Sequence, residues 1–339
     1  MRAISGSRAI DPVWVLNSVL VLVALALCAV AISLGSTPLG LTRAVSALVG
    51  NGAVADAIVV LEIRLPRALA ALLTGAALGL SGAALQGLLR NPLAEPGVLG
   101  VSASASLGAT LALFFGLLSV SSWALPGAAV AGALAATALL MLAARRVSSV
   151  VTLLLIGVGL SSFAGALMAL LMNLSPNPFT LSDMVNWMLG SVSNRSLSDL
   201  YFAAPFMLVG AVVLMLVRND LSVLTLGEEA AAGSGLNVAR LRWLVILGTG
   251  LCTGASVSLA GAIGFVGIVA PHIVRPWVAY RPGAVLVPSA LLAGCIVLAA
   301  DIVVRILPTG SELKLGVVAA LIGAPAFVWI ASRRGVEHA

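Results

Sequence analysis

Very few side chains in this sequence could carry out chemistry. Its 339 residues include one lysine, Lys314, two histidines, His272 and His338, and three cysteines that all lie within apolar runs. A P-loop needs its lysine after a glycine-rich turn and directly before Ser or Thr, whereas Lys314 lies between two leucines. The sequence has no H-E-x-x-H pattern and no Cys/His cluster of the kind that binds zinc. We therefore expect no nucleotide hydrolysis, no catalytic residues and no metal site on this chain.

Asp301 and Arg305 are the clearest pair of opposite charges within an apolar run. Their four-residue spacing places them on one face of a helix. An unpaired charge at the centre of a membrane helix costs several kcal/mol, about 2.5–3.5 on insertion scales. Two interpretations stay open: the pair neutralises itself locally, or Arg305 is presented to a partner molecule.

These residues are positioned by a chain whose composition suits lipid rather than water. Hydrophobic residues make up 61% of the sequence and charged residues 9%, and the mean hydropathy is +1.16; a soluble domain carries roughly a quarter charged residues. A helix needs about 20 apolar residues to cross the hydrocarbon core. The sequence predicts an all-α, polytopic membrane protein with about ten transmembrane helices, in one domain over residues 1–339. The expected spans are 13–35, 64–86, 98–118, 123–144, 150–173, 200–217, 242–262, 263–277, 284–306 and 315–332.

The loops between these spans indicate the orientation. With a cytoplasmic N-terminus, ten spans place 12 of the 18 basic residues inside and 6 outside, which the positive-inside rule favours. Both termini are then cytoplasmic. The outer segment 174–199 contains an apolar piece that is too short to span, Met184–Gly190, and predicts a re-entrant or interfacial helix. Residues 218–241 form the longest cytoplasmic loop.

Glycine is abundant, with 35 residues that lie mostly within the expected spans. Gly75, Gly79 and Gly82 recur at helical spacing. In lipid, helices associate through close packing, and small residues let their backbones approach one another. We expect a tightly packed helical bundle.

Several motifs occur in a fixed order along the chain. The longest motif is RLPRALAALLTGAALGLSGAALQGLLRNPLAEPGVLGVS (Arg64–Ser102). The others are NWMLGS (Asn186–Ser191), LGEEAAAGSGLNVARLR (Leu226–Arg242), GAIGFVGIVAPHIVR (Gly261–Arg275), ADIVVR (Ala300–Arg305) and GVVAALIGAPAFVWI (Gly316–Ile330). Taken together, they resemble the FecCD-type permeases, the membrane subunits of bacterial ABC importers for ferric siderophores, haem and cobalamin. The resemblance covers nearly the whole chain after about residue 58.

The resemblance implies a type II ABC importer permease architecture in the bacterial cytoplasmic (inner) membrane. The subunit would form a homodimer in the lipid bilayer, with the substrate path between the two copies. Two ATPase subunits would bind ATP and Mg, and a periplasmic binding protein would deliver the substrate. The chain itself would carry no cofactor, would bind no nucleic acid and would not be an enzyme. Its expected function is to move an iron chelate into the cytoplasm: a ferric siderophore, or haem or cobalamin.

Three sites follow from the resemblance. The family presents outer-face arginines to glutamates of the binding protein, and the matching residues are Arg64, Arg67 and Arg305; exposed arginines suit carboxylate recognition, and interfacial snorkelling is the alternative. The EAA-x-x-x-G coupling loop, which would contact the ATPase, matches Glu228, Glu229, Ala230, Ala231 and Gly235. The cytoplasmic gate would lie at Ser148, Ser149, Val150 and Val151, with the fifth and tenth spans lining the path.

The sequence departs from the family pattern at one place, and two other functional classes have to be considered. SELKLG (Ser311–Gly316) replaces the usual E-L-P-[VI]-G, so Lys314 occupies an atypical place beside the mouth of the path. An ion-coupled secondary transporter of a small solute usually has a buried acidic residue at the membrane midplane, and the second to seventh expected spans contain none. An intramembrane enzyme would need a paired nucleophile or a metal set, which we do not find.

Overall fold

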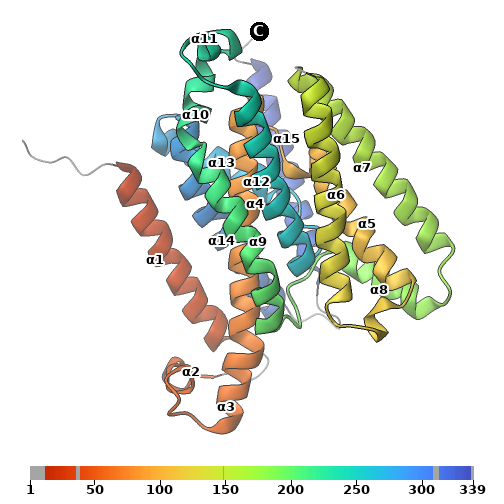
Figure 1. The fold of residues 1–339 in the computed structure, drawn as a ribbon. Helices are drawn as coiled ribbons and strands as arrows, with labels where there is room; N and C mark the ends of the chain where they lie inside the picture. The colour runs from red at the N-terminus through yellow and green to blue at the C-terminus, as the bar shows by residue number, and fades with distance from the viewer. Residues whose placement is uncertain (1–11, 36–38, 148, 308–312, 337–339) are drawn as a thin grey trace, which may run out of the picture.

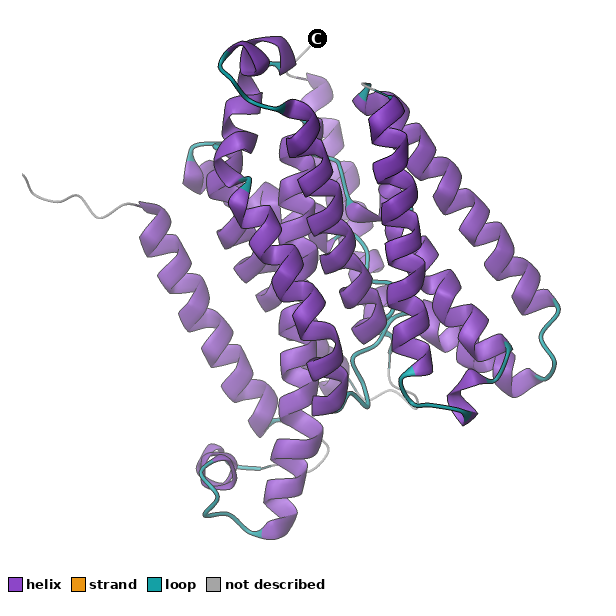
Figure 2. Cartoon of the chain, in the orientation of Figure 1, coloured by secondary structure: helices purple, strands orange, loops and turns teal. Residues whose placement is uncertain are grey.

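A computed structural model describes residues 12–35, 39–147, 149–307 and 313–336. These residues form helices joined by short connections, and no strand occurs in these ranges (Figure 2). The predicted all-α class is therefore confirmed.

Seven helical stretches are long and apolar enough to cross a membrane. They are α1 (Pro12–Ser33), the continuous stretch of α3 (Val54–Ile58), η1 (Val59–Arg64) and α4 (Leu65–Leu89), α6 (Ala124–Arg146), α7 (Val150–Asn173), α9 (Leu197–Leu216), α12 (Val238–Ala260) and α14 (Pro282–Ile306). Three further helices are apolar but do not reach that length over the residues whose side chains the structure describes. They are α5 (Val101–Phe114), α13 (Val266–Val274) and α15 (Leu315–Val336). Each of the ten expected spans thus overlaps one of these helices, seven of which are long and apolar enough to cross a membrane.

Short helices cover the two ends of the bundle. One end carries α10 (Arg218–Val223) and α11 (Glu228–Gly233), and α15 ends beside them; we call it the α11 end (Figure 1). The opposite end, the α2 end, carries α2 (Leu41–Leu48), α3 and α8 (Pro178–Met188). The short helix predicted within 174–199 is α8. The remaining turns are η2 (Pro96–Leu99), η3 (Leu117–Ser119), η4 (Leu224–Leu226) and η5 (Arg275–Val278).

Helices α4 and α12 form the centre of the bundle. About 78% of the most apolar stretch of each is buried, against 22% for α1 and α7, which lie at opposite flanks (Figure 1). The close approach predicted for the α4 glycines is confirmed. A Cβ on Gly79 would lie 2.4 Å from the carbonyl oxygen of Ser289 in α14, and one on Gly82 would lie 2.0 Å from that of Gly267 in α13. Gly75 meets α14 in the same way, so a side chain has no room at these positions.

The helices fall into two sets with matching contacts, and the central helices of the two sets, α4 and α12, run in opposite directions (Figure 1). In the first set α4 is followed by α5, α6 and α7, and in the second α12 is followed by α13, α14 and α15. Helix α4 packs against α14 and α13, while α12 packs against α6 and α5. Likewise α5 contacts α6 and α7, while α13 contacts α14 and α15. In each set a long central helix ends in a non-helical segment, at 90–95 and at 261–265.

Backbone polar groups in these two non-helical segments need partners, because irregular backbone at membrane depth is tolerated only where it is satisfied internally. The Gln86 side chain supplies two bonds, from Nε2 to the Ala94 oxygen (3.2 Å) and to the Gly267 oxygen (3.1 Å). The Gly267 oxygen needs a partner because Pro271, four residues later, has no N–H. The chain is non-helical at 261–265, and Pro271 lies within the helix that follows, α13.

Candidate functional site

Two glycines with positive φ shape the segment around α11. Gly227 has φ +100° and Gly235 has φ +92°, values that residues with a side chain rarely adopt. Between them Ala231 is fully buried, and its carbonyl oxygen accepts a hydrogen bond from the Leu236 N–H at 3.0 Å. Glu229 is exposed. The predicted coupling residues, Glu228, Glu229, Ala230, Ala231 and Gly235, thus form one short helix and turn at the α11 end.

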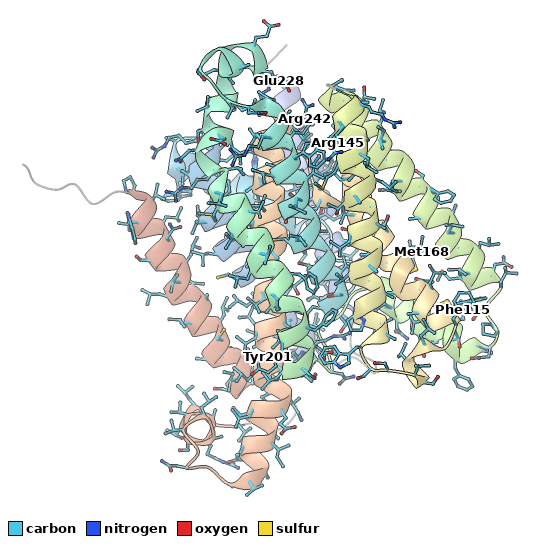
Figure 3. The ribbon with its side chains drawn as sticks, viewed as in Figure 1. Phe115, Arg145, Met168, Tyr201, Glu228 and Arg242 are labelled. Carbon is cyan, nitrogen blue, oxygen red and sulfur yellow. The ribbon has the colours of Figure 1, made fainter. Side chains whose placement is uncertain are left out.

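Arg242 of α12 connects this helix to the end of α6. Its Nη2 lies 3.4 Å from Oε1 of Glu228, and its Nη1 donates to the Val147 carbonyl oxygen at 3.4 Å. Arg145 lies over the Trp243 ring, 4.3 Å from its centroid. Figure 3 shows Glu228, Arg242 and Arg145 at the same end of the molecule. Arg242 therefore contacts both α11 and the residue that directly follows α6.

The turn that joins α6 to α7 holds the predicted gate. Ser148 lies outside the described residues, and for Val150 the structure describes the backbone but not the side chain. Ser149 caps α7, because its Oγ accepts a hydrogen bond from the Thr152 N–H at 3.4 Å. Val151 is exposed. The gate stays a prediction, but its residues adjoin the contact made by Arg242.

At the α2 end, Asp301 binds two of the three predicted docking arginines. Its side chain is almost fully buried. Arg67 contacts it through Nη2 (2.8 Å) and Nε (3.0 Å), and Arg305 contacts it through Nη2 (2.6 Å). The interpretation of Asp301 and Arg305 as a local ion pair is confirmed. Arg67, which lies 234 residues away along the chain, enlarges the pair to a three-residue cluster.

Arg64 and Arg305 bind the last carbonyl groups of α1. Arg64 Nη1 donates to the oxygens of Ile32 (2.9 Å) and Ser33 (2.8 Å), and Arg305 Nη1 donates to that of Ala31 (3.1 Å). The final carbonyls of a helix have no partner within the helix, so cationic side chains at this position both satisfy them and interact favourably with the helix dipole.

This placement corrects one expectation about the arginines. The sequence suggested exposed side chains on the outer face, but Arg64 is 4% exposed, and the side chains of Arg67 and Arg305 are 13% and 10% exposed. The reason is their internal partners, since α1 and Asp301 use these guanidinium groups within the chain. Whether they also bind another protein stays a prediction.

Comparison with known proteins agrees with this architecture. The profile of the FecCD transport family matches residues 21–333. The chain belongs to the FecCD transport family. This permease is 41% identical over 281 residues to the uncharacterized ABC transporter permease protein YvrB of Bacillus subtilis. The alignment covers 81% of this chain and 79% of YvrB. It is 42% identical over 270 residues to the vitamin B12 import system permease protein BtuC of Salmonella typhi, with 79% and 82% covered.

A solved structure shares the fold of this FecCD permease. It is described as a metal-chelate type ABC transporter in an inward-facing conformation, and it superposes with a TM-score of 0.83 at 31% sequence identity. The superposition covers 94% of this chain and 98% of the other. The predicted ABC importer permease architecture is thus confirmed, and the chain is a multi-pass membrane permease of that type.

Sequence reasoning does not single out the polar contacts at the two breaks of this FecCD permease. Glu95 Oε1 accepts a hydrogen bond from the backbone N–H of Phe265 at 2.5 Å, and Phe265 has a positive φ of +65°. Gln86 Oε1 accepts from Arg275 Nη2 at 2.5 Å. The available signals were a glutamine inside the apolar run of α4 and an acidic residue directly before Pro96.

Proposed function

We propose that this permease moves a bulky metal chelate into the cytoplasm: a ferric siderophore, haem or cobalamin. The observation that carries the proposal is the family match over residues 21–333. Two relatives support the substrate class. BtuC is named for import of vitamin B12, itself a cobalt chelate, and the similar structure is described as metal-chelate type.

The α11 end is proposed to face the cytoplasm. Basic side chains gather there, in agreement with the positive-inside rule; among the described residues they are Arg90, Arg145, Arg146, Arg218, Arg240, Arg242, Arg275 and Arg281. Two ATPase subunits, which bind ATP and Mg, would contact α11, and a periplasmic binding protein would dock at the α2 end. In docking, the guanidinium groups of Arg67 and Arg305 would bind carboxylates of the binding protein, while Asp301 holds both groups in place.

A second copy of the chain is proposed to complete the path, which would run between the two copies and be lined by α7 and α15. Both helices leave large apolar side chains uncovered in the single chain, among them Val151 (65% exposed), Leu155 (65%), Phe163 (62%) and Leu321 (71%). Such surfaces face lipid or another protein. A path between two copies needs few specific contacts, because the binding protein selects the substrate.

Reconstitution tests this function. In proteoliposomes that contain the permease and its ATPase, uptake of ferric siderophore, haem or cyanocobalamin should require both ATP and the loaded binding protein. Collapsing the proton and sodium gradients should leave uptake unchanged. Uptake at full rate without the ATPase would instead show an ion-coupled secondary transporter, and failure with all three ligands would reject the substrate class.

Gly235→Val should uncouple ATP hydrolysis from uptake. A β-branched residue is strained at φ +92°, so the turn after α11 must change shape. Strain of this kind is of order 1–3 kcal/mol, and we expect uptake per ATP to fall about tenfold while hydrolysis continues. Gly233→Ala is the matched control, since Gly233 lies within α11 and a Cβ there meets nothing within 4 Å. Equal uptake per ATP in both variants would contradict the coupling role.

A further inference from the structure

The turn η2, which follows Glu95, packs directly against α7. Ser161 Oγ of α7 donates a hydrogen bond to the Gly97 carbonyl oxygen at 3.2 Å. A Cβ built on Gly157 of α7 would lie 2.7 Å from Cα of Leu99, so the two backbones touch at that point. The segment that begins at Glu95 is therefore in direct contact with α7.

Phe265, at the start of α13, is seated on α15 in the corresponding way. A Cβ built on Gly323 of α15 would lie 2.3 Å from Cβ of Phe265. The Phe265 ring also meets the Phe327 ring, with 6.4 Å between their centroids. Phe265 thus fits against α15 at a place that only a glycine leaves open.

The hydrogen bond from the Phe265 N–H to Glu95 Oε1 links the segment that contacts α7 to the residue that contacts α15. It connects residues 170 positions apart, one in each of the two sets of helices. The Glu95 carboxylate lines a cavity of about 120 Å³ together with Ser102 and Gly264, so it has space to move away. Phe265 holds a left-handed backbone conformation that few non-glycine residues adopt, and losing the bond would allow that backbone to relax.

We propose that Glu95 is a positioning residue that makes α7 and α15 move together during transport, by holding the backbone of Phe265 across the two broken segments. This inference rests on the proposed function, in which α7 and α15 line the path between the two copies. The bond keeps the two path-lining helices in step while it is made, and Gln86, which binds both Ala94 and Gly267, ties the same two segments together beside it.

The test compares Glu95→Leu, which removes the acceptor, with Glu95→Gln, which keeps an acceptor oxygen, in the complex with ATPase and binding protein. The net contribution of a typical hydrogen bond is enough to shift an equilibrium by up to about tenfold. We expect Glu95→Leu to lose uptake per ATP by about that factor, and Glu95→Gln to restore most of it. Ser102→Ala is the matched control, because Ser102 lines the same cavity and should leave uptake unchanged.

A second readout measures the coupling itself. Spin labels at Val158 of α7 and Leu321 of α15, both exposed, are attached after the native cysteines are replaced, and distances between them are recorded with and without ATP. We expect one concerted change in the native chain and in Glu95→Gln, and broad or separate changes in Glu95→Leu. Should Glu95→Leu not purify intact, Glu95→Asp, whose carboxylate is one methylene shorter, takes its place.

Two results would overturn the inference: native distances and uptake in Glu95→Leu, or equal losses in Glu95→Gln and Glu95→Leu. The spin-label measurement needs no transported substrate. A native complex that shows concerted distance changes but imports none of the three chelates would therefore reject the proposed function and leave the role of Glu95 standing.

Discussion

Asp301→Asn should lower the free energy of unfolding of the purified permease by about 3–5 kcal/mol, the cost of removing one partner from a buried ion pair. Asp301 is 1% exposed and is the carboxylate shared by Arg67 and Arg305. Asparagine keeps the shape but loses the negative charge, so both guanidinium groups lose the carboxylate that they share. Unfolding in mixed detergent micelles measures the change.

Asp56→Asn is the matched control for Asp301→Asn. Asp56 also binds an arginine, Arg43, at 2.7 Å, but the Arg43 side chain is 63% exposed. Its hydrogen bond to Asp56, followed by the charge of that carboxylate, raises the pKa of Arg43 above its ordinary value; when Asp56 is neutralised, water still solvates the cation. The control should lose far less stability. Similar losses in both variants would show that burial does not govern the Asp301 cluster.

A further comparison separates the charge cluster from the α1 contacts. If the loss of the shared negative charge causes the destabilisation, Asp301→Asn combined with Arg67→Gln should lose less stability than the sum of the two single variants, because contacting residues are coupled. Charge-reversal variants that are made to test docking can also disturb the contacts with α1. Reversing the charge of Arg64 would remove the bonds to Ile32 and Ser33, so weaker docking in that variant would first report a displaced α1.

The membrane architecture could be predicted because it depends on signals that are local in sequence. Apolar runs of the right length gave the spans, and Gly75, Gly79 and Gly82 at helical spacing indicated a close contact that the structure places on α14 and α13. The short helix α8 and the turn around α11 also follow from local patterns, namely an apolar run too short to span and a glycine after an acidic helix start.

The contacts that join distant segments could not be predicted in this way. Nothing near Arg64 in the sequence indicates that the end of α1 will need its guanidinium group, and nothing near Glu95 points to an N–H 170 residues away. The pairing of the two helix sets is likewise a property of packing rather than of residue identity. The sequence draws attention to the few charged residues inside an apolar chain, but their partners within the protein are set by the tertiary structure.

Gly82→Ala should destabilise the permease by about 3 kcal/mol or more, beyond the usual cost of overpacking a core (~1–3 kcal/mol). The added methyl group would lie 2.0 Å from the Gly267 oxygen and 2.7 Å from its carbonyl carbon. Both are backbone atoms of α13, and Gln86 also binds that oxygen, so α13 would have to move as a unit. Alanine's higher helix propensity offsets only about 1 kcal/mol of this.

Gly127→Ala is the control that isolates packing from propensity. Gly127 lies in α6, where an added Cβ would meet nothing within 4 Å, so the substitution should be neutral or stabilising by up to about 1 kcal/mol. The measurement is the fraction of each variant that stays monodisperse after heating in detergent, followed by unfolding in mixed micelles. If Gly82→Ala were as stable as Gly127→Ala, α4 and α13 could not be in backbone contact, and the placement of the break at 261–265 would be wrong.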